Sequence, residues 1–583
     1  MAVSQDRSGL PRYRWVLRET DPLSPEPRWK ALAQALGCHP LLARVLVARG
    51  IETPEEARAF LNPSEADLLP PEAVPGLARA RDRLSAAVAN REPVLIHGDY
   101  DADGIIGTVI LHSTLKELGC PSRIFLPERS LHGYGLASQA VKKAVAAGIR
   151  LMVSVDCGIS SHETIAEARD AGIEVIVTDH HAMPEHLPSD AILVHPDLEG
   201  KYPDGDIAGA AVAYKLSLSL LAARGGDVEA ARESYLPLVA LATVADVCPL
   251  TGENRAIVGS GLKGIPTSRV PGLRTLWLGT RREGESGPVT ARDAAFGLAP
   301  VLNAAGRMGD PFPAARLLLA GDEDTAWKHL RVLLQTNRER KKAQAETLRR
   351  LRSRPEVAWG SESKGILVLV DECCAPGLAG LAAARLAEET GRPTCVLAPC
   401  EDETGLIYRG SMRSAGAEDL LELMAPVDGI SEHLGGHAGA LGLTVRRERL
   451  GEFLKACEEI AWTPKPPELT LDFAVDRTPT DPEAVTALDA TRPWGEGNPQ
   501  PAFMWGPVRV KGTRAVGKGG EHVQVTLHSE DGAIIKGIGF SMSRYLDEES
   551  ASGRMAQTAG HFLLNEWQGR SSVEFQLRDL DFL

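Results

Sequence analysis

One stretch joins a short apolar run to a cluster of polar side chains: Val94-Leu95-Ile96-His97-Gly98-Asp99-Tyr100-Asp101-Ala102-Asp103-Gly104. An apolar run of strand length, residues 94–96, stops at one histidine and three alternating aspartates, and residues 105–118 then show a largely apolar helical pattern. This order is typical of a turn at the carboxyl end of a parallel strand, where open α/β sheets place their sites. Carboxylates this close repel one another unless protons or cations relieve them. The stretch therefore indicates either a divalent-metal site or an acidic surface turn with a structural histidine.

Two further strands deliver residues of the same kind. Residues 151–155 form an apolar run that ends at Asp156, and residues 174–178 form another that ends at Asp179-His180-His181. Because the carboxyl ends of parallel strands share one rim of a sheet, we expect convergence of His97, Asp101, Asp103, Asp156 and His180. A fourth apolar run, residues 238–245, ends in Asp246, which is a candidate sixth ligand beside the others and would by itself be read as a helix cap. Imidazole and carboxylates together suit Mn²⁺, and Mg²⁺ or Zn²⁺ less well.

The composition is that of an ordinary soluble globular protein with several domains. The chain has 583 residues, of which 43% are hydrophobic and 24% charged, and its net charge of −14 argues against a uniformly basic nucleic-acid binder. No run of about 18 apolar residues predicts a membrane span, and the first residues lack a signal core. The nine cysteines are scattered without the paired spacing of a zinc site. We therefore expect a cytoplasmic monomer without a membrane association.

Four motifs resemble those of the DHH phosphoesterase superfamily: residues 97–104, Val155-Asp156-Cys157-Gly158, Asp179-His180-His181 and Thr243-Val244-Ala245-Asp246. Other segments resemble, more narrowly, the RecJ family of bacterial single-strand-specific 5′-to-3′ exonucleases: Gly133 to Leu136, Asn303 to Gly309, Gly435 to Ala438, Pro493 to Pro499 and Leu564 to Arg570. The match runs in family order from about residue 76 to the C-terminus. The chain departs from the family pattern with Cys374-Ala375 in place of Trp-His and with His195 in place of asparagine.

The resemblance implies two divalent metal ions, Mn²⁺ or Mg²⁺, held in a ligand scheme that Asp156 bridges. One ion takes His97, Asp101 and Asp156, and the other takes Asp103, Asp156, His180 and Asp246. Asp99 and Asp179 orient the ligand imidazoles, and His181 faces the scissile phosphate as a donor or acid. His181 and Asp99 are thus the predicted catalytic residues beyond the metal ligands.

The resemblance also implies residues that bind the nucleic acid. Arginine forks suit a terminal phosphate because they bind two of its oxygens at once, and glycines let backbone amides approach a phosphate closely. Aromatic side chains can stack on bases. The predicted contacts are Arg129, Tyr134, Asn303, Arg307, Ser411, Arg413, Gly435, Gly436, His437, Lys518 and Trp567.

The domain organisation follows from the pattern of elements and linkers. We expect a helical segment over residues 1–75, a parallel-sheet DHH domain over 76–334, a connecting helix over 335–355 and a second α/β domain, DHHA1, over 356–462. After a Pro-rich linker at residues 463–467, alternating short strands indicate a small β-barrel, which the resemblance identifies as an OB fold over 463–583. An OB fold grips single strands with basic and aromatic side chains.

The predicted function is 5′-to-3′ exonucleolytic hydrolysis of single-stranded DNA by a two-metal mechanism, in DNA repair and recombination. Partners in keeping with this function are a single-strand-binding protein or a RecQ-type helicase. One alternative is a DHH phosphodiesterase of short oligonucleotides or cyclic dinucleotides, but such relatives typically stop after the second lobe. Another is a non-catalytic replication scaffold, which should have lost metal ligands, whereas all six candidate positions retain them.

Overall fold

The computed structural model describes residues 12–19, 28–128, 135–198, 202–281, 287–357, 365–402, 405–416, 418–463, 466–543, 545–546, 551–567 and 570–583. These residues form two compact units. One unit contains residues 63–463 and a short later segment, Pro493–Asn498, and the other contains the N-terminal residues up to Asn62 together with most of the chain after residue 464. We call them the two-lobe unit and the barrel unit.

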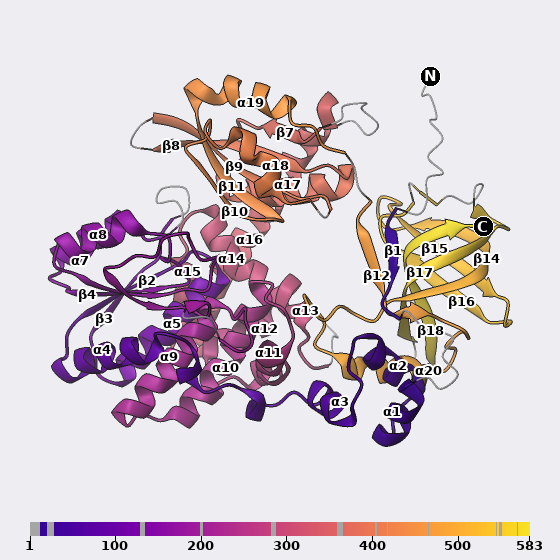
Figure 1. The fold of residues 1–583 in the computed structure, drawn as a ribbon, viewed down its shortest axis with the longest axis horizontal. Coiled ribbons are helices and arrows are strands. Elements are labelled where there is room, and N and C mark those ends of the chain that lie inside the picture. The colour runs from indigo at the N-terminus through magenta and orange to yellow at the C-terminus, as the bar shows by residue number, and fades with distance from the viewer. Residues whose placement is uncertain are drawn as a thin grey trace. The chain divides into compact units, whose positions relative to one another are not determined.

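The first lobe of the two-lobe unit is a parallel sheet with helices on both faces. Its strand order is β3-β2-β4-β5-β6, and every pairing is parallel. The strands are β2 (Val94–Gly98), β3 (Ser122–Phe125), β4 (Leu151–Val155), β5 (Glu174–Thr178) and β6 (Ala191–Val194). Side chains alternate between the faces: Val94 and Ile96 join the core beneath α4, α5 and α9, whereas Leu95 joins the core beneath α7 and α8 (Figure 1).

The first helix after β2 lies close to the residues over which the sequence predicts it. The helix predicted over residues 105–118 runs over 102–117. The full set is α4 (Leu77–Asn90), α5 (Ala102–Glu117), α7 (Ser138–Ala146), α8 (His162–Asp170), α9 (Gly209–Arg224), α10 (Val228–Ala245), α11 (Gly252–Gly264), α12 (Pro271–Thr280), α13 (Ala291–Asp293), α14 (Ala299–Met308) and α15 (Phe312–Leu318).

A long helix, α16 (Glu323–Arg352), leads from the first lobe to the second. It begins 12 residues before the predicted start at 335, because Asp322 caps it and its first half buries Ala326, Leu330 and Leu333. The second lobe is a mixed sheet in the order β10-β11-β9-β8-β7. Its elements are β7 (Leu367–Val370), α17 (Pro376–Thr390), β8 (Thr394–Asp402), β9 (Gly405–Arg413), α18 (Leu420–Met424), β10 (His433–His437), β11 (Ala440–Arg446) and α19 (Leu450–Glu458).

The barrel unit contains a closed five-stranded barrel in the order β14-β15-β16-β18-β17, in which β17 pairs back onto β14. Phe503, Trp505, Phe562 and Phe575 pack against one another in its core. The elements of this part are β12 (Glu468–Leu471), β13 (Phe473–Ala474), α20 (Pro482–Ala487), β14 (Phe503–Val516), β15 (His522–Ser529), β16 (Ile534–Gly539), β17 (Met555–Trp567) and β18 (Arg570–Phe582).

The N-terminal segment belongs to the barrel unit. Its elements are β1 (Arg14–Leu17), α1 (Arg28–Leu36), α2 (Pro40–Ala48) and α3 (Pro54–Leu61). Strand β1 pairs in parallel with β12, and the helices share a core to which Ala487 of α20 contributes. No helix within the described residues combines the length and the apolar character that crossing a membrane requires.

Candidate metal centre

The carboxyl ends of β2, β4 and β5 bring the predicted ligands together at one rim of the sheet. His180 lies at the middle: its Nε2 is 3.1 Å from Asp156 Oδ1, 3.5 Å from Asp246 Oδ2 and 3.7 Å from Asp103 Oδ2. Asp246 reaches this point from the C-terminal end of α10. The predicted convergence of these four side chains is therefore present in the structure.

Three groups of side chains are close enough to hold a metal ion among the described residues. They are Asp99 with Asp101 and Asp156, Asp103 with His180 and Asp246, and Asp156 with His180 and His181. Asp156 Oδ1 and His180 Nε2 are buried atoms that form no hydrogen bond within the part of the chain described. Buried polar atoms without hydrogen bonds are costly unless a cation uses their lone pairs, so the donor set fits divalent metal ions.

The same three groups contain Asp99 and not His97. The buried His97 ring is oriented by protein contacts: its Nε2 accepts a hydrogen bond from the Ala137 amide at 3.1 Å, and its Nδ1 lies 3.7 Å from Cys157 Sγ. His97, predicted as a ligand, lies in contact with Ala137 and Cys157. Asp99, predicted to orient imidazoles, lies in one of the groups that could hold an ion.

Asp103 is held by the start of α9. Its two carboxylate oxygens accept hydrogen bonds from the backbone amides of Gly209 at 2.7 Å and Ala210 at 2.9 Å. The positive end of the helix dipole also favours a carboxylate there. Gly209 and Ala210 were not predicted from the sequence, although a glycine at the start of a long apolar helix is a recognisable feature of it.

The electrostatics of the rim favour a bound cation. Burial raises the pKa of Asp156 well above its usual range, and the charges of Asp103 and Asp101 raise it further. Burial and the charge of Asp246 raise the pKa of Asp103 to about 7. Burial and the charge of Asp101 likewise raise the pKa of Asp246 to about 7. A divalent cation would relieve this repulsion and restore the ionised forms.

His181 and Asp179 form a separate pair beside the ligands. Their Nδ1 and Oδ1 atoms are 2.7 Å apart, and the buried Asp179 carboxylate also accepts amide hydrogen bonds from His180 and Ile159. Although burial opposes both shifts, this pairing lowers the pKa of Asp179 to about 2 and raises that of His181 to about 9. The Asp179 carboxylate thus favours the protonated form of His181, the form that its predicted role as a donor would use.

His195 supports this pair and was not predicted to do so. It directly follows β6, and its Nδ1 accepts a hydrogen bond from the Asp197 amide at 3.0 Å. Its Nε2 therefore carries the proton and donates to the carbonyl of His181 at 2.7 Å. A histidine at the carboxyl end of the next strand of the sheet was the available signal, because neighbouring strands end at the same rim.

A second cluster of predicted residues lies at the start of α17. Arg413 Nη1 donates to Ser411 Oγ at 2.6 Å, and Gly380 packs so closely that an added Cβ would lie 2.8 Å from Arg413 Nη2. Arg307 Nη1 donates to the Gly377 carbonyl at 3.3 Å. Arg413 also faces Ala440 across β9 and β11, and Ala440 faces His437 across β11 and β10. The structure thus gathers Arg307, Ser411, Arg413 and His437.

The remaining predicted contacts are placed differently. Asn303 hydrogen-bonds to the backbone of the metal-ligand loop rather than lying free on a surface. Gly435 and Gly436 are part of β10, where an added Cβ at Gly436 would lie 2.3 Å from the Ala440 carbonyl oxygen. Lys518 is exposed in the turn between β14 and β15. Arg129, Tyr134 and the side chain of Trp567 lie outside the described residues.

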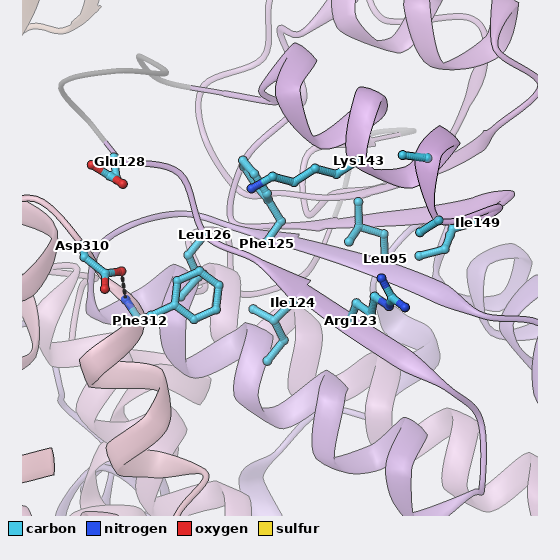
Figure 2. A pocket seen from close by; sticks show the side chains of 12 residues that line it. Leu95, Arg123, Ile124, Phe125, Leu126, Glu128, Lys143, Ile149, Asp310 and Phe312 are labelled. Carbon is cyan, nitrogen blue, oxygen red and sulfur yellow. Dashed lines mark hydrogen bonds between the residues drawn. The ribbon is translucent and has the colours of Figure 1, made fainter. Parts of the chain in front are cut away.

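A cavity of about 640 Å³ lies along the edge strand β3 (Figure 2). Phe125 and Phe312 line it together with Arg123 and Lys143, whose Nζ is 4.7 Å from the centre of the Phe125 ring. The Phe125 ring lies 5.1 Å from that of His97 on β2. Among the described residues, neither His97 nor any of the candidate ligands lines the cavity, which is connected to His97 through the Phe125 ring.

Comparison with known proteins places this site in a class. Residues 93–243 match the family model described as "DHH family, N-terminal domain", and residues 471–579 match "RecJ OB domain". The single-stranded-DNA-specific exonuclease RecJ of Escherichia coli is 31% identical, with 92% of this chain and 94% of that protein covered. The RecJ of Thermus thermophilus is 33% identical over 98% of this chain and 79% of that protein.

The crystal structure of the Thermus thermophilus RecJ in complex with Mn²⁺ superposes with a TM-score of 0.80, at 30% identity, over 98% of this chain and 80% of that one. A structure of the same protein with Mg²⁺ gives a TM-score of 0.74 at 29% identity, over 98% and 78% of the two chains. The fold and the rim of carboxylates and histidines define a metal-dependent hydrolase of the DHH class. Within that class, the chain belongs to the RecJ family of exonucleases.

Proposed function

We propose that this chain hydrolyses single-stranded DNA from its 5′ end and acts in DNA repair and recombination. One observation carries the proposal: side chains from four separate segments converge at one sheet rim, with His180 Nε2 within 3.7 Å of Asp103, Asp156 and Asp246. Such a set suits phosphodiester hydrolysis, and relatives that share the fold are named as single-stranded-DNA-specific exonucleases.

The proposed ligand scheme follows the geometry. Asp99, Asp101 and Asp156 would hold one ion, and Asp103, Asp156, His180 and Asp246 would hold the other. Asp156 can belong to both sets because a carboxylate has two oxygens with available lone pairs. Two divalent ions such as Mn²⁺ or Mg²⁺ would supply Lewis acidity, which lowers the pKa of a water molecule and neutralises phosphate charge. His97 keeps the end of β2 in place through Ala137 and Cys157.

His181 is proposed to donate a proton or a hydrogen bond at the scissile phosphate. Its Nδ1 faces Asp179, so its Nε2 is the atom directed away from that partner. The pairing keeps the imidazolium charged at neutral pH, and the side chain remains 39% exposed, which leaves it accessible to a strand. His195 contributes by holding the His181 backbone through its carbonyl.

Recognition of the 5′ end is proposed for the cluster at the start of α17. Arg307 and Arg413 each carry a planar guanidinium group, one nitrogen of which donates to the protein, and Ser411 adds a hydroxyl. A terminal phosphate offers more oxygens than an internal one, so guanidinium groups that bind two oxygens at once favour the end of a strand.

The barrel is proposed to hold the remainder of the strand. Lys518 lies in the turn between its first two strands, a position at which OB folds contact oligonucleotides. Nearby, the ring of His522 packs edge-on against that of Phe540, which is 53% exposed. Exposed aromatic and basic side chains together suit stacking on bases and contact with phosphates.

The direct test is digestion of strands labelled separately at the 5′ and 3′ ends, with Mn²⁺ or Mg²⁺ supplied to metal-free protein. We expect release of the 5′ label first, no activity without metal, and no attack on a blunt duplex. Early release of the 3′ label would contradict the polarity. Hydrolysis confined to dinucleotides would favour a phosphodiesterase of short oligonucleotides instead, and metal binding without any hydrolysis would favour a scaffold.

Arg413→Lys tests the proposed end recognition. Lysine keeps the charge but loses the fork, and a charge-assisted hydrogen bond contributes roughly 1.5–3 kcal/mol, so recognition should weaken about ten- to a hundred-fold. The loss should appear on strands with a 5′-phosphate and be much smaller on strands with a 5′-hydroxyl. Arg385→Lys, on the exposed side of α17 where Arg385 pairs with Glu388, is the matched control. Equal losses on both kinds of strand would assign Arg413 to general backbone steering.

A further inference from the structure

Asn303 of α14 is bonded to the loop that carries the aspartates. Its Oδ1 accepts a hydrogen bond from the backbone amide of Ala102 at 2.7 Å, across 201 positions of sequence. Ala102 is the first residue of α5, and the amides at the start of a helix have no partner within that helix. Asp101 Oδ1 accepts from the next two amides, at 3.0 and 3.2 Å. Asn303 therefore completes the capping of this turn.

Gly306 brings the same helix against the same loop. It lies three positions after Asn303 and so on the same side of α14. A Cβ built at Gly306 would lie 2.2 Å from the carbonyl oxygen of Tyr100, a distance that real side chains do not adopt. Only glycine allows α14 to approach Tyr100 this closely, and Tyr100 stands between two candidate ligands, Asp99 and Asp101.

The C-terminal end of α14 contacts the second lobe. Arg307 Nη1 donates to the Gly377 carbonyl at 3.3 Å, and a Cβ at Gly377 would lie 2.2 Å from the Arg307 carbonyl oxygen. One helix of ten residues thus touches the ligand loop on one side and the start of α17 on the other. Its placement ties the ligand loop to the lobe in which end recognition is proposed.

We infer that Asn303 is a positioning residue of the metal centre, and that its side chain and the close packing at Gly306 together hold the Asp99–Asp103 loop in the geometry that binds metal. The sequence analysis predicted Asn303 as a contact to nucleic acid. The inference rests on the proposed metal binding. It differs from the nucleic-acid prediction in a measurable way, because a residue that shapes the ligand loop changes metal affinity in the absence of any strand.

The experiment measures Mn²⁺ binding to metal-free full-length protein by titration calorimetry and, separately, the affinity for a single strand in the presence of a chelator. For Asn303→Ala we expect Mn²⁺ affinity to fall about ten-fold or more, the usual effect of losing a group that orients ligands, and strand affinity to stay within about two-fold. Asn303→Asp keeps an acceptor oxygen and should restore most of the Mn²⁺ affinity. Asn62→Ala, which also removes one bond between an asparagine side chain and the backbone, is the matched control and should bind Mn²⁺ like wild type.

Gly306→Ala displaces the loop without removing any hydrogen-bonding group. It therefore tests whether α14 shapes the metal-binding loop even if Asn303→Ala does not fold. It too should lose Mn²⁺ affinity. Unchanged Mn²⁺ affinity in folded Asn303→Ala, or in Gly306→Ala, would overturn the inference. Weaker strand binding with unchanged Mn²⁺ binding would instead support the prediction that Asn303 contacts the nucleic acid. Absence of Mn²⁺ binding by wild-type protein would instead overturn the proposed metal centre.

Discussion

Asp156 has an unusual backbone conformation and is the ligand proposed to be shared by the two metal ions. Its φ of 63° lies in the left-handed region, which asparagine and aspartate tolerate better than other residues. Asp156→Asn therefore keeps the backbone and the size of the side chain but removes the charge and one acceptor oxygen. We expect Mn²⁺ affinity and hydrolysis to fall by roughly a hundred-fold or more, as for loss of a ligand or its support. Titration calorimetry and strand digestion measure the two effects.

Strand affinity in the presence of a chelator serves as the control for Asp156→Asn and should match wild type. Asp156→Ala would be a poorer probe, because alanine in a left-handed conformation costs about 1–2 kcal/mol by itself. Near-normal turnover of Asp156→Asn would show that the bridging assignment is incorrect.

The Asp179–His181 pair predicts a pH dependence of activity. His181, with its pKa near 9, stays protonated through neutral pH because Asp179 is ionised beside it. Asp179→Asn removes that charge, so the pKa of His181 should fall toward its ordinary value of about 6.5. We expect the alkaline limb of the rate profile to move to lower pH by about two units. Hydrolysis rates measured between about pH 5.5 and 10 test this, and an unmoved limb in Asp179→Asn would remove His181 from the role of donor.

The Asp179–His181 pair also stabilises the metal-free protein over a defined range of pH. The lowered pKa of Asp179 gives a contribution that is lost as pH falls through about 2, and the raised pKa of His181 gives one that is lost as pH rises through about 9. Asp179→Asn should therefore lower stability most between about pH 4 and 6.5, the ordinary values of the two groups. The loss should be about 1 kcal/mol, because His181 is 39% exposed.

At the scale of elements, a substitution at the start of α9 should weaken metal binding with little effect on the stability of the fold. A Cβ at Gly209 would lie 2.6 Å from Asp156 Oδ1 and would push that carboxylate out of place. Gly209→Ala should reduce Mn²⁺ affinity by about ten-fold. It should change the unfolding free energy of the metal-free protein by no more than about 1 kcal/mol, since alanine favours a helix. Calorimetry of binding and denaturant unfolding measure the two quantities.

Gly451→Ala is the matched control for Gly209→Ala. Gly451 is also in the first turn of its helix, α19, and a Cβ there would meet no atom within 4 Å. It should leave Mn²⁺ affinity unchanged. A similar loss of affinity in both variants would mean that helix substitutions disturb the site indirectly and that the contact at Gly209 is unimportant.

At the scale of the whole molecule, the barrel unit is assembled from both ends of the chain. Asp579, fully buried in β18, accepts hydrogen bonds from the amides of Arg12 and Tyr13 and from Trp15 Nε1 at 2.8 Å. Arg49 forms a two-bond ion pair with Asp472, at 2.8 and 3.1 Å, in which both side chains are nearly inaccessible. Removing the residues after 463 alone would therefore leave the N-terminal part of the barrel unit without its partners, and it would also remove Pro493–Asn498, which belongs to the two-lobe unit.

Arg49→Met tests the contribution of the N-terminal segment to the barrel unit. Breaking a buried ion pair by removing one partner costs roughly 3–5 kcal/mol, and we expect about 3 because Arg18 Nε remains 4.0 Å from Asp472. Calorimetry should show one transition at lower temperature together with weaker binding of long strands, while short strands are still hydrolysed. Arg14→Ala, whose pair with Glu468 is 66% and 45% exposed, should cost about 1 kcal/mol or less. Equal effects of Arg49→Met and Arg14→Ala would contradict the proposed contribution of the N-terminal segment to the barrel unit.

The amino-acid sequence by itself determined the sheet and its rim. The alternation of apolar strands and helices is a local pattern, and the strands expected at residues 151–155 and 174–178 occupy those same residues. Parallel strands end on one side, so Asp103, Asp156 and His180 had to approach one another wherever the helices packed. Asp246 follows the helix α10 and not a strand, so local signals alone assign it to a helix end, and it became a ligand candidate only together with the other motifs.

Only the tertiary structure decided which polar side chain at the rim faces the centre. His97 lies in β2 and Asp99 directly follows that strand, and the direction of the His97 ring depends on contacts with Ala137 and Cys157 that no local pattern encodes. The contacts of Asn303 with Ala102, of Gly209 with Asp103 and of Asp579 with Tyr13 span 201, 106 and 566 positions. Local propensity fixes the elements, whereas the orientation of side chains in loops, and the partner of each chain end, follow from packing between segments distant in sequence.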